Sequence, residues 1–341
     1  MPTPLFDASA VAVSRPRGPR IVRGALAAVA LLALVVLAGP RYEAGPDTPS
    51  PRAAPAQEVG ALEDWLRVSE AAYSDIRPGA AKGLVWHSPT QQRTPWAVVY
   101  LHGFSATRLE TAPLADQVAQ ALGANAFHTR LSGHGRTSAA MGEASMQDWM
   151  ADALEAVRIG HLLGERVLLI SCSTGSTLAA WLALTPEGRQ VDAHVFVSPN
   201  FGPKDKRSEI INGPWGQQIA FALEGQERGQ LSVDARENEA WTLRYPTRAL
   251  FPMMAMVKKV RDSDLTQFKT PVLMLYSQGD QTVDPLETER ALARIGAPLK
   301  LGQVVSYSQS KGQHVLAGDI KDPLATAPMA ASIIKWAQAL N

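Results

Sequence analysis

The sequence contains a single cysteine, Cys172, so one chain cannot form an internal disulfide or a multi-cysteine zinc or iron–sulfur site. It also has no excess of charge of either sign, because 33 lysines and arginines stand against 32 aspartates and glutamates. Since a basic field is missing, we expect no nucleic-acid partner. Internal repeats of about 20–50 residues are missing as well, which excludes solenoids and propellers.

The chain has only one long apolar run, the uncharged stretch 24–39 near the N-terminus. A basic segment, residues 1–20, precedes it, and basic residues followed by an apolar run are typical of an export signal. With Arg23 able to reach toward the lipid headgroups, residues 21–39 approach the ~20 residues that span a bilayer. The sequence therefore predicts a transmembrane anchor or signal helix at 21–39, with a cleaved signal peptide as the alternative.

The arginines of this segment determine the expected location of the protein. By the positive-inside rule they stay in the cytoplasm, and the chain that follows is exported to the periplasmic or extracellular side. We expect the protein to be held at the membrane by its N-terminal helix, or to be secreted if the signal is cleaved. Nine of the 24 prolines lie within the first 56 residues, and residues 40–57 predict an extended Pro-rich linker.

Residues 58–341 alternate short β-branched runs with helical stretches, which predicts the α/β class, with a mostly parallel central sheet flanked by helices. Buried strands are expected at 96–101, 166–171, 192–197 and 271–276, with a final strand at 304–308. Helices are expected at 111–122, 146–163, 176–184, 285–295 and 325–340. In such sheets, functional residues lie at the carboxyl ends of the strands.

Residues 200–268 interrupt this alternation and contain no clear strand. An insertion of this size between two sheet strands predicts a small cap over the site. Its bulky apolar side chains are candidates for an apolar substrate pocket, and the candidates are Phe201, Trp215, Phe251 and Met254. The alternative is a set of surface helices with no role in binding, because methionines and aromatic residues also fill ordinary cores.

The most informative motif is the run 170–176, Ile-Ser-Cys-Ser-Thr-Gly-Ser, which follows a buried strand and opens a helix of small residues. A serine on a sharp turn between strand and helix is lifted above the sheet edge, where the amide groups and the positive dipole of the helix also point. This context predicts Ser173 as a nucleophile. Cys172 is the rival thiol, but its place in the turn directs it inward as a small hydrophobe.

A second motif, Leu101-His-Gly-Phe104, also follows a buried strand. Acyl transfer places negative charge on the former carbonyl oxygen, and two backbone amides can hold that charge. The expected donors of this oxyanion hole are the amides of Phe104 and Thr174. His102 is expected to shape the loop without taking part in proton transfer.

A serine nucleophile needs a base to take its proton and a carboxylate to orient that base. His314 lies in a loop near the carboxyl end of the chain and completes the order Ser, Asp, His. Two aspartates compete for the carboxylate. Asp284 precedes Pro285 and is therefore expected to cap a helix, which leaves Asp280 to orient His314.

Together these motifs resemble the α/β-hydrolase superfamily and, within it, bacterial carboxylesterases and monoacylglycerol lipases, a group also described as serine aminopeptidase or lysophospholipase-like hydrolases. The resemblance covers about residues 80–340 and includes Gly133-His-Gly135 as a structural loop. It implies an α/β-hydrolase domain at 58–341 with a cap at about 200–268. It also implies a triad of Ser173, Asp280 and His314. The chain departs from the pattern at Ser171, where a glycine is usual.

The sequence therefore predicts a serine hydrolase that cleaves carboxylic esters, of small molecules or of lipids, through an acyl-enzyme. Amidase or peptidase, thioesterase and acyltransferase activities would use the same residues, and a non-catalytic binding protein on this fold is the alternative from another class. No spacing of metal ligands is present, so neither a metal nor a cofactor is expected. Acyl and alcohol specificity and the oligomeric state do not follow from the sequence.

Overall fold

The structure is a computed structural model in which residues 18–340 are described. The chain divides after Pro40 into two units, and each is described by itself. In the first unit, helix α1 runs over Gly18–Leu37. Among residues 18–340, no helix is long and apolar enough to cross a membrane, so the predicted transmembrane anchor at 21–39 is not supported.

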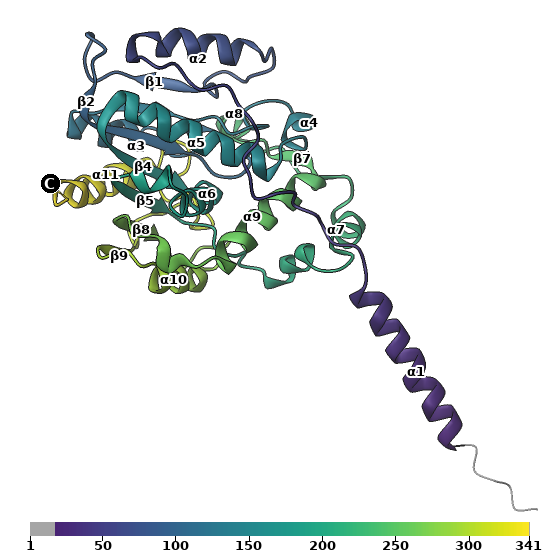
Figure 1. The fold of residues 1–341 in the computed structure, drawn as a ribbon. Coiled ribbons are helices and arrows are strands. Elements are labelled where there is room, and N and C mark those ends of the chain that lie inside the picture. The colour runs from purple at the N-terminus through teal and green to yellow at the C-terminus, as the bar shows by residue number, and fades with distance from the viewer. Residues whose placement is uncertain (1–17, 341) are drawn as a thin grey trace, which may run out of the picture. The chain divides into compact units, whose positions relative to one another are not determined.

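The second unit is built on a seven-stranded sheet with strand order β1-β3-β2-β4-β5-β8-β9 (Figure 1). The strands are β1 Gly83–Val85, β2 Thr94–Leu101, β3 Asn125–His128, β4 Gly164–Cys172, β5 Ala193–Val197, β8 Val272–Tyr276 and β9 Lys300–Val304. β1 pairs with β3 in the antiparallel sense, and all the other pairs are parallel. The predicted fold class is confirmed.

Helices cover both faces of this sheet. Residues on β2 alternate between two apolar clusters, with Val99 in one and Val98 in the other, because successive side chains of a strand point to opposite faces. The Val98 side is covered by α3 Leu114–Leu122 and α11 Pro323–Gln338. The Val99 side is covered by α2 Leu62–Ala71, α5 Met146–Leu163, α6 Thr174–Leu182, α9 Leu250–Asp262 and α10 Pro285–Arg294.

Two sequence predictions about strands are wrong. The final strand is at 300–304, where Lys300–Val304 pairs with β8, and not at 304–308. It was missed because it is an edge strand whose apolar residues, such as Leu301, remain exposed, so it has no buried apolar run. The insertion 200–268 also contains two short strands, β6 Glu227–Gly229 and β7 Arg244–Pro246, which form an antiparallel ribbon.

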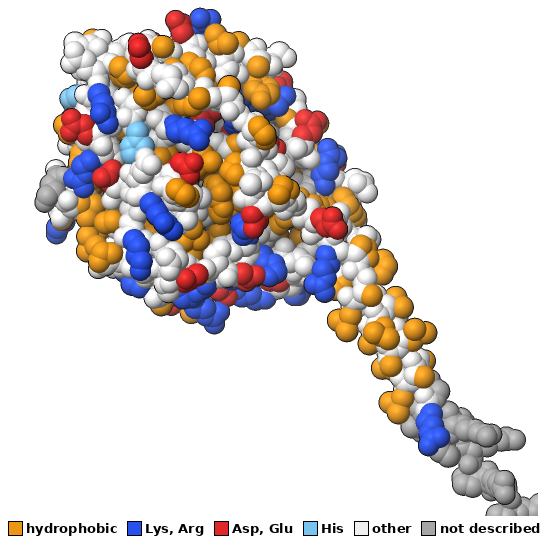
Figure 2. Space-filling model, viewed as in Figure 1, with side chains coloured by type: hydrophobic (Ala, Val, Ile, Leu, Met, Phe, Trp, Pro, Cys, Tyr) orange, Lys and Arg blue, Asp and Glu red, His pale blue; other side chains and the backbone are white. Residues whose placement is uncertain are grey.

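The rest of the cap consists of helices: η4 Lys206–Asn212, α7 Gly216–Glu224, α8 Ala235–Ala240, η5 Thr247–Ala249, the long α9 and η6 Leu265–Gln267. The face seen in Figure 2 carries positive and negative side chains interspersed, as the balanced composition would give.

Residues 41–57 contain no helix or strand, but they are hydrogen-bonded to the rest of the second unit, and we call them the strap. The amide of Ser50 donates to the carbonyl of Gln147 at 3.0 Å. The Gln147 amide Nε2 donates back to the strap carbonyls of Ala44 (2.6 Å) and Pro46 (2.7 Å). The Pro-rich segment therefore lies against α5 through these hydrogen bonds.

Candidate active site

The turn at Ser173 has an uncommon backbone conformation. β4 ends at Cys172, α6 begins at Thr174, and Ser173 between them has φ of 52° and ψ of −119°. A non-glycine residue with positive φ is strained and is held there only by its surroundings. Here the Ser173 amide donates to the carbonyl of Val197 (2.9 Å), and the Ser173 carbonyl accepts from the amide of Asn200 (3.1 Å).

Close packing explains which residues the turn accepts. A Cβ added to Gly175 would lie 2.4 Å from the carbonyl oxygen of Leu101, so only glycine fits at that position. Ser171, which stands where a glycine is usual, is fully buried and donates its hydroxyl to Ser176 Oγ at 3.0 Å. Its side chain is therefore accommodated with its hydrogen bond made, and the departure from the pattern does not disturb the turn.

The structure brings Ser173, His314 and Asp280 together. His314 Nε2 lies 2.9 Å from Ser173 Oγ, and His314 Nδ1 lies 2.8 Å from Asp280 Oδ2. All three side chains are largely buried, with Ser173 only 8% exposed. A proton can therefore pass from the hydroxyl to the imidazole, while the carboxylate holds the opposite ring nitrogen.

Backbone amides fix the carboxylate. Asp280 follows β8, and its Oδ1 accepts from the amides of Thr282 (2.8 Å) and Val283 (2.9 Å), which leaves Oδ2 for His314. Asp284 instead caps α10 by accepting from the amide of Leu286 (3.1 Å), as the following proline predicted. The two aspartates thus have different structural duties although they are four residues apart.

Sequence reasoning missed Gln313, which joins the loops that carry Asp280 and His314. Its Nε2 donates to the carbonyls of Ser308 (2.9 Å) and Ser310 (3.0 Å), and its Oε1 accepts from Ser277 Oγ (3.0 Å). Gln313 also has a positive φ of 53°. A glutamine in a polar loop has no periodicity or spacing that would reveal such a role.

The two predicted oxyanion amides border the same turn. In the part of the chain that the structure describes, the amides of Phe104 and Thr174 donate to no other protein atom. The Thr174 amide is free because it belongs to the first turn of α6, whose amides have no partner within the helix. A Cβ on Gly103, the residue before Phe104, would lie 3.1 Å from Ser173 Cβ, so the oxyanion loop and the serine are in direct contact.

His102 shapes this loop, as expected. Its Nε2 accepts from the amide of Leu131 (3.0 Å), so Nδ1 carries the hydrogen and donates to the Gly103 carbonyl (2.9 Å). Burial lowers the pKa of His102 to about 4, so it is neutral at pH 7. Because a trans peptide places its N–H opposite its C=O, this bond directs the Phe104 amide away from His102. His134, between two glycines, is also buried, and its ring packs against that of Phe104 at 5.9 Å.

A cavity of about 440 Å³ lies in the cap between η4, α7 and α9. Of the four predicted pocket residues, Met254 lines it. The structure does not bring the other three there. Phe201 packs in the main core against Phe196, and Phe251 packs against Tyr42 and Phe221. Trp215 is the N-cap residue that precedes α7, and 37% of its surface is exposed.

Met253 connects this cavity to the turn. It lines the cavity, and its sulfur lies 3.7 Å from Asn200 Nδ2, which donates to Thr174 Oγ1 at 3.2 Å. The side chains of Met253 and Asn200 therefore connect the wall of the cap cavity to the serine turn. Among residues 18–340, no group of three or more histidines, cysteines, aspartates and glutamates is placed to hold a metal ion.

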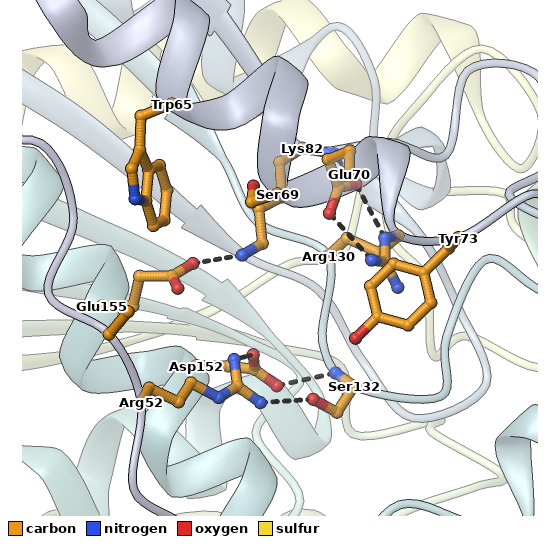
Figure 3. Close-up of a pocket in the computed structure, with 11 residues that line it drawn as sticks. Arg52, Trp65, Ser69, Glu70, Tyr73, Lys82, Arg130, Ser132, Asp152 and Glu155 are labelled. Atoms are coloured by element: carbon orange, nitrogen blue, oxygen red, sulfur yellow. Dashed lines mark hydrogen bonds and ion pairs between the residues drawn. The ribbon is translucent and has the colours of Figure 1, made fainter.

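A second cavity, of about 290 Å³, lies beside the strap and holds six charged side chains (Figure 3). Figure 3 shows them joined as three ion pairs, Arg52 with Asp152, Lys82 with Glu155, and Arg130 with Glu70. Arg52 Nη2 also donates to Ser132 Oγ at 2.6 Å. Each charge in this cavity has a partner, so we assign it to docking of the strap and not to a ligand.

Known structures share the fold. One of the metagenome-derived lipolytic enzymes LipS and LipT is 21% identical, with a TM-score of 0.60, and the match covers 77% of this chain and 99% of that one. A soluble variant of monoglyceride lipase from Saccharomyces cerevisiae is 14% identical (TM-score 0.59, 89% and 99% covered). The monoacylglycerol lipase of Paleococcus ferrophilus is 16% identical (0.56, 76% and 98%). At these identities the likeness shows the fold alone.

No curated protein matches the sequence. The family described as Serine aminopeptidase, S33, matches residues 92–309, which include the serine turn, the oxyanion loop and the Asp280 loop but stop before His314. Since this match covers more than half of the chain, and the fold is that of an α/β-hydrolase, the chain belongs to the serine aminopeptidase family.

Proposed function

We propose that this protein is a serine hydrolase that cleaves carboxylic esters through an acyl-enzyme. The observation that supports this most directly is the continuous hydrogen-bonded chain from Ser173 through His314 to Asp280, with spacings of 2.9 and 2.8 Å. Ester substrates are proposed because lipolytic enzymes and monoacylglycerol lipases share the fold. A cap cavity whose lining includes apolar residues such as Leu250 and Met254 also lies near the serine turn.

In the proposed reaction, Ser173 Oγ attacks the ester carbonyl carbon while His314 Nε2 takes its proton. The amides of Phe104 and Thr174 hold the negative oxygen of the tetrahedral intermediate. When the C–O bond to the alcohol breaks, His314 returns the proton to the leaving oxygen. A water molecule then releases the acid by the same steps, and Asp280 stabilises the imidazolium each time it forms.

Replacing the nucleophile tests the proposal. Ser173→Ala is expected to lower kcat/KM on short p-nitrophenyl esters at least ~10³-fold and to abolish labelling by a fluorophosphonate probe. The reason is that, among residues 18–340, Ser173 supplies the only hydroxyl bonded to His314. Ser138→Ala changes a half-buried serine at the start of the short helix α4, Ser138–Met141. It serves as the matched control and should leave both readouts unchanged. Activity and labelling that survive in Ser173→Ala would exclude the assignment.

A substrate screen separates ester cleavage from peptidase activity, which the same triad can support. Esters of graded acyl length and aminoacyl amides are offered to the wild-type enzyme, and we expect esters to be turned over with the higher kcat/KM. A preference for aminoacyl amides would instead place this chain among aminopeptidases by activity as well as by family.

We further propose that the hydrolase unit is exported, because four arginines precede the apolar stretch at the N-terminus. Separating the cytoplasmic, periplasmic, membrane and medium fractions of a producing cell, with immunodetection of the unit, tests this. Recovery of the protein in the cytoplasmic fraction alone would refute export.

A further inference from the structure

Glu110 is a buried carboxyl group that the proposed triad does not use. It ends a short 3-10 helix, Arg108–Glu110, and is only 1% exposed. Its Oε1 accepts two hydrogen bonds, from the amide of Gly103 at 2.6 Å and from the hydroxyl of Tyr100 at 2.8 Å. The Tyr100 hydroxyl in turn accepts from Thr111 Oγ1 at 2.7 Å.

This carboxyl group lies directly beneath the proposed reaction centre. A Cβ built on Gly103 would meet Glu110 Oε2 at 3.0 Å, Ser173 Cβ at 3.1 Å and the Cys172 carbonyl at 3.4 Å. Gly103 of the oxyanion loop therefore lies between the carboxyl group of Glu110 and Ser173.

Both backbone polar groups of Gly103 form hydrogen bonds with side chains. Glu110 accepts from its N–H, and His102 donates to its C=O. Glycine has the greatest backbone freedom of any residue, so without these bonds its conformation would vary. The conformation of Gly103 sets the direction of the next amide, which is the Phe104 N–H that is proposed to bind the oxyanion.

The groups that face Glu110 leave its charge without compensation. Tyr100 of β2 and Cys172 of β4 are its titratable neighbours, and within residues 18–340 it forms no ion pair with a lysine, arginine or histidine. Burial raises the pKa of Glu110 to about 8, against the lowering effect of its hydrogen bonds. Burial also raises the pKa values of Tyr100 and Cys172 well above their usual ranges, so neither neighbour ionises before Glu110.

We propose that Glu110 is a positioning residue that, in its neutral form, holds Gly103 so that the Phe104 amide points at the oxyanion, and that its ionisation at alkaline pH weakens the oxyanion hole. This inference rests on the proposed serine-hydrolase function. The neutral carboxyl group can accept from Gly103 without placing charge near the reaction. The ionised group would repel the negative oxygen across a poorly screened interior.

The pH dependence of kcat tests the inference first on the wild-type enzyme. We expect kcat to fall as the pH rises through about 8, where the carboxyl group of Glu110 loses its proton. Glu110→Gln keeps an acceptor for Gly103 and cannot ionise, so its kcat at pH 7 should stay within about threefold of wild type. The alkaline decline should be lost in this variant. A wild-type profile without an alkaline decline, or the same decline in Glu110→Gln, would overturn the proposal.

Glu110→Ala removes the acceptor altogether. We expect kcat to fall about 10²-fold with KM nearly unchanged, because a misdirected oxyanion donor weakens the transition state more than the bound ester. An unchanged kcat would contradict the positioning role. Thermal unfolding of each variant shows whether it is folded. If Glu110→Ala does not fold, the pH profiles of kcat for the wild type and Glu110→Gln decide whether the proposal holds.

Glu155→Gln is the matched control, because Glu155 is also a buried glutamate but pairs with Lys82 away from the serine turn. It should keep the alkaline decline of the wild type. The Ser173→Ala variant separates the two proposals. If it remains active, the serine-hydrolase function fails. If it is inactive and Glu110→Gln keeps the alkaline decline of the wild type, only the role of Glu110 fails.

Discussion

The serine turn and the strap cavity are both rich in polar groups, but the two regions differ in whether those groups have partners within the protein. In the strap cavity, each of six charged side chains has an oppositely charged partner. At the serine turn, within the described residues, the amides of Phe104 and Thr174 have no protein partner, and Ser173 has a strained backbone.

The difference shows what marks a reactive site in this molecule. A high density of charge does not mark it, because the charged side chains of the strap cavity are paired with one another and therefore offer little to a ligand. The reactive site is marked by backbone amides without a protein partner that lie next to a residue held in an unfavourable conformation. The two regions should consequently respond differently to substitution: the turn through activity, and the strap cavity through stability.

The largest expected effect is at Asp280. Asp280→Asn keeps a side-chain oxygen for the amides of Thr282 and Val283 but loses the charge that stabilises the imidazolium. We expect kcat to fall about 10⁴-fold with little change in the unfolding temperature. Steady-state kinetics on a p-nitrophenyl ester and thermal unfolding measure the two effects.

Asp284→Asn is the matched control for this change. Asparagine caps a helix about as well as aspartate, so α10 should persist and kcat should remain within about twofold of wild type. If both variants lost activity equally, the carboxylate of the triad would not be assigned to Asp280.

An intermediate effect is expected at Gln313. Gln313→Ala removes the hydrogen bond from Ser277 Oγ, which joins the two loops, and the two bonds to the carbonyls of Ser308 and Ser310 within the His314 loop. The imidazole is then less well positioned. We expect kcat to fall about 10- to 10²-fold, with a smaller change in KM. Gln303→Ala, whose amide donates to Ser332 on α11 instead, should leave kcat unchanged. Equal kinetics for the two variants would contradict a positioning role for Gln313.

The sequence contained the information for much of the central fold. Strands such as 96–101 are continuous apolar runs because both faces of a parallel strand are buried, and this pattern needs no knowledge of partners. The turn at Ser173 was predictable for the same local reason, since its strand, serine, glycine and helix are consecutive. Pro285 distinguished Asp284 from Asp280 through the preference of proline for the first turn of a helix.

What the sequence did not reveal depends on contacts between distant segments. The strap is bound by Arg52 to Asp152, which are 100 residues apart, and no local pattern predicts this pair. Glu110 precedes the helix expected at 111–122 and has no distinguishing sequence pattern, and only the fold places it beside Gly103. The edge strand Lys300–Val304 is exposed, so it lacks the apolar signal that identified the inner strands.

The smallest effect on activity is expected at the strap. Arg52→Met keeps the apolar stem and leaves Asp152 buried without its ion-pair partner. Because Arg52 is 26% exposed, we expect the free energy of unfolding to fall by about 1–3 kcal/mol, less than for a fully buried pair. The double variant Arg52→Met/Asp152→Asn should recover part of this loss, since the unpaired charge is then removed as well.

The activity of Arg52→Met tests whether the strap and the serine turn are independent of each other. Asp152 Oδ2 also accepts from the amide of Ser132 (2.6 Å), whose carbonyl accepts from Trp149 Nε1 (3.0 Å), and the Trp149 ring packs against Phe104 at 6.1 Å. If these contacts transmitted the loss of the ion pair to the oxyanion loop, Arg52→Met would lower kcat as well as the free energy of unfolding. We expect kcat of the folded variant to stay within about twofold of wild type, because His102 and Glu110 hold Gly103 independently of the strap.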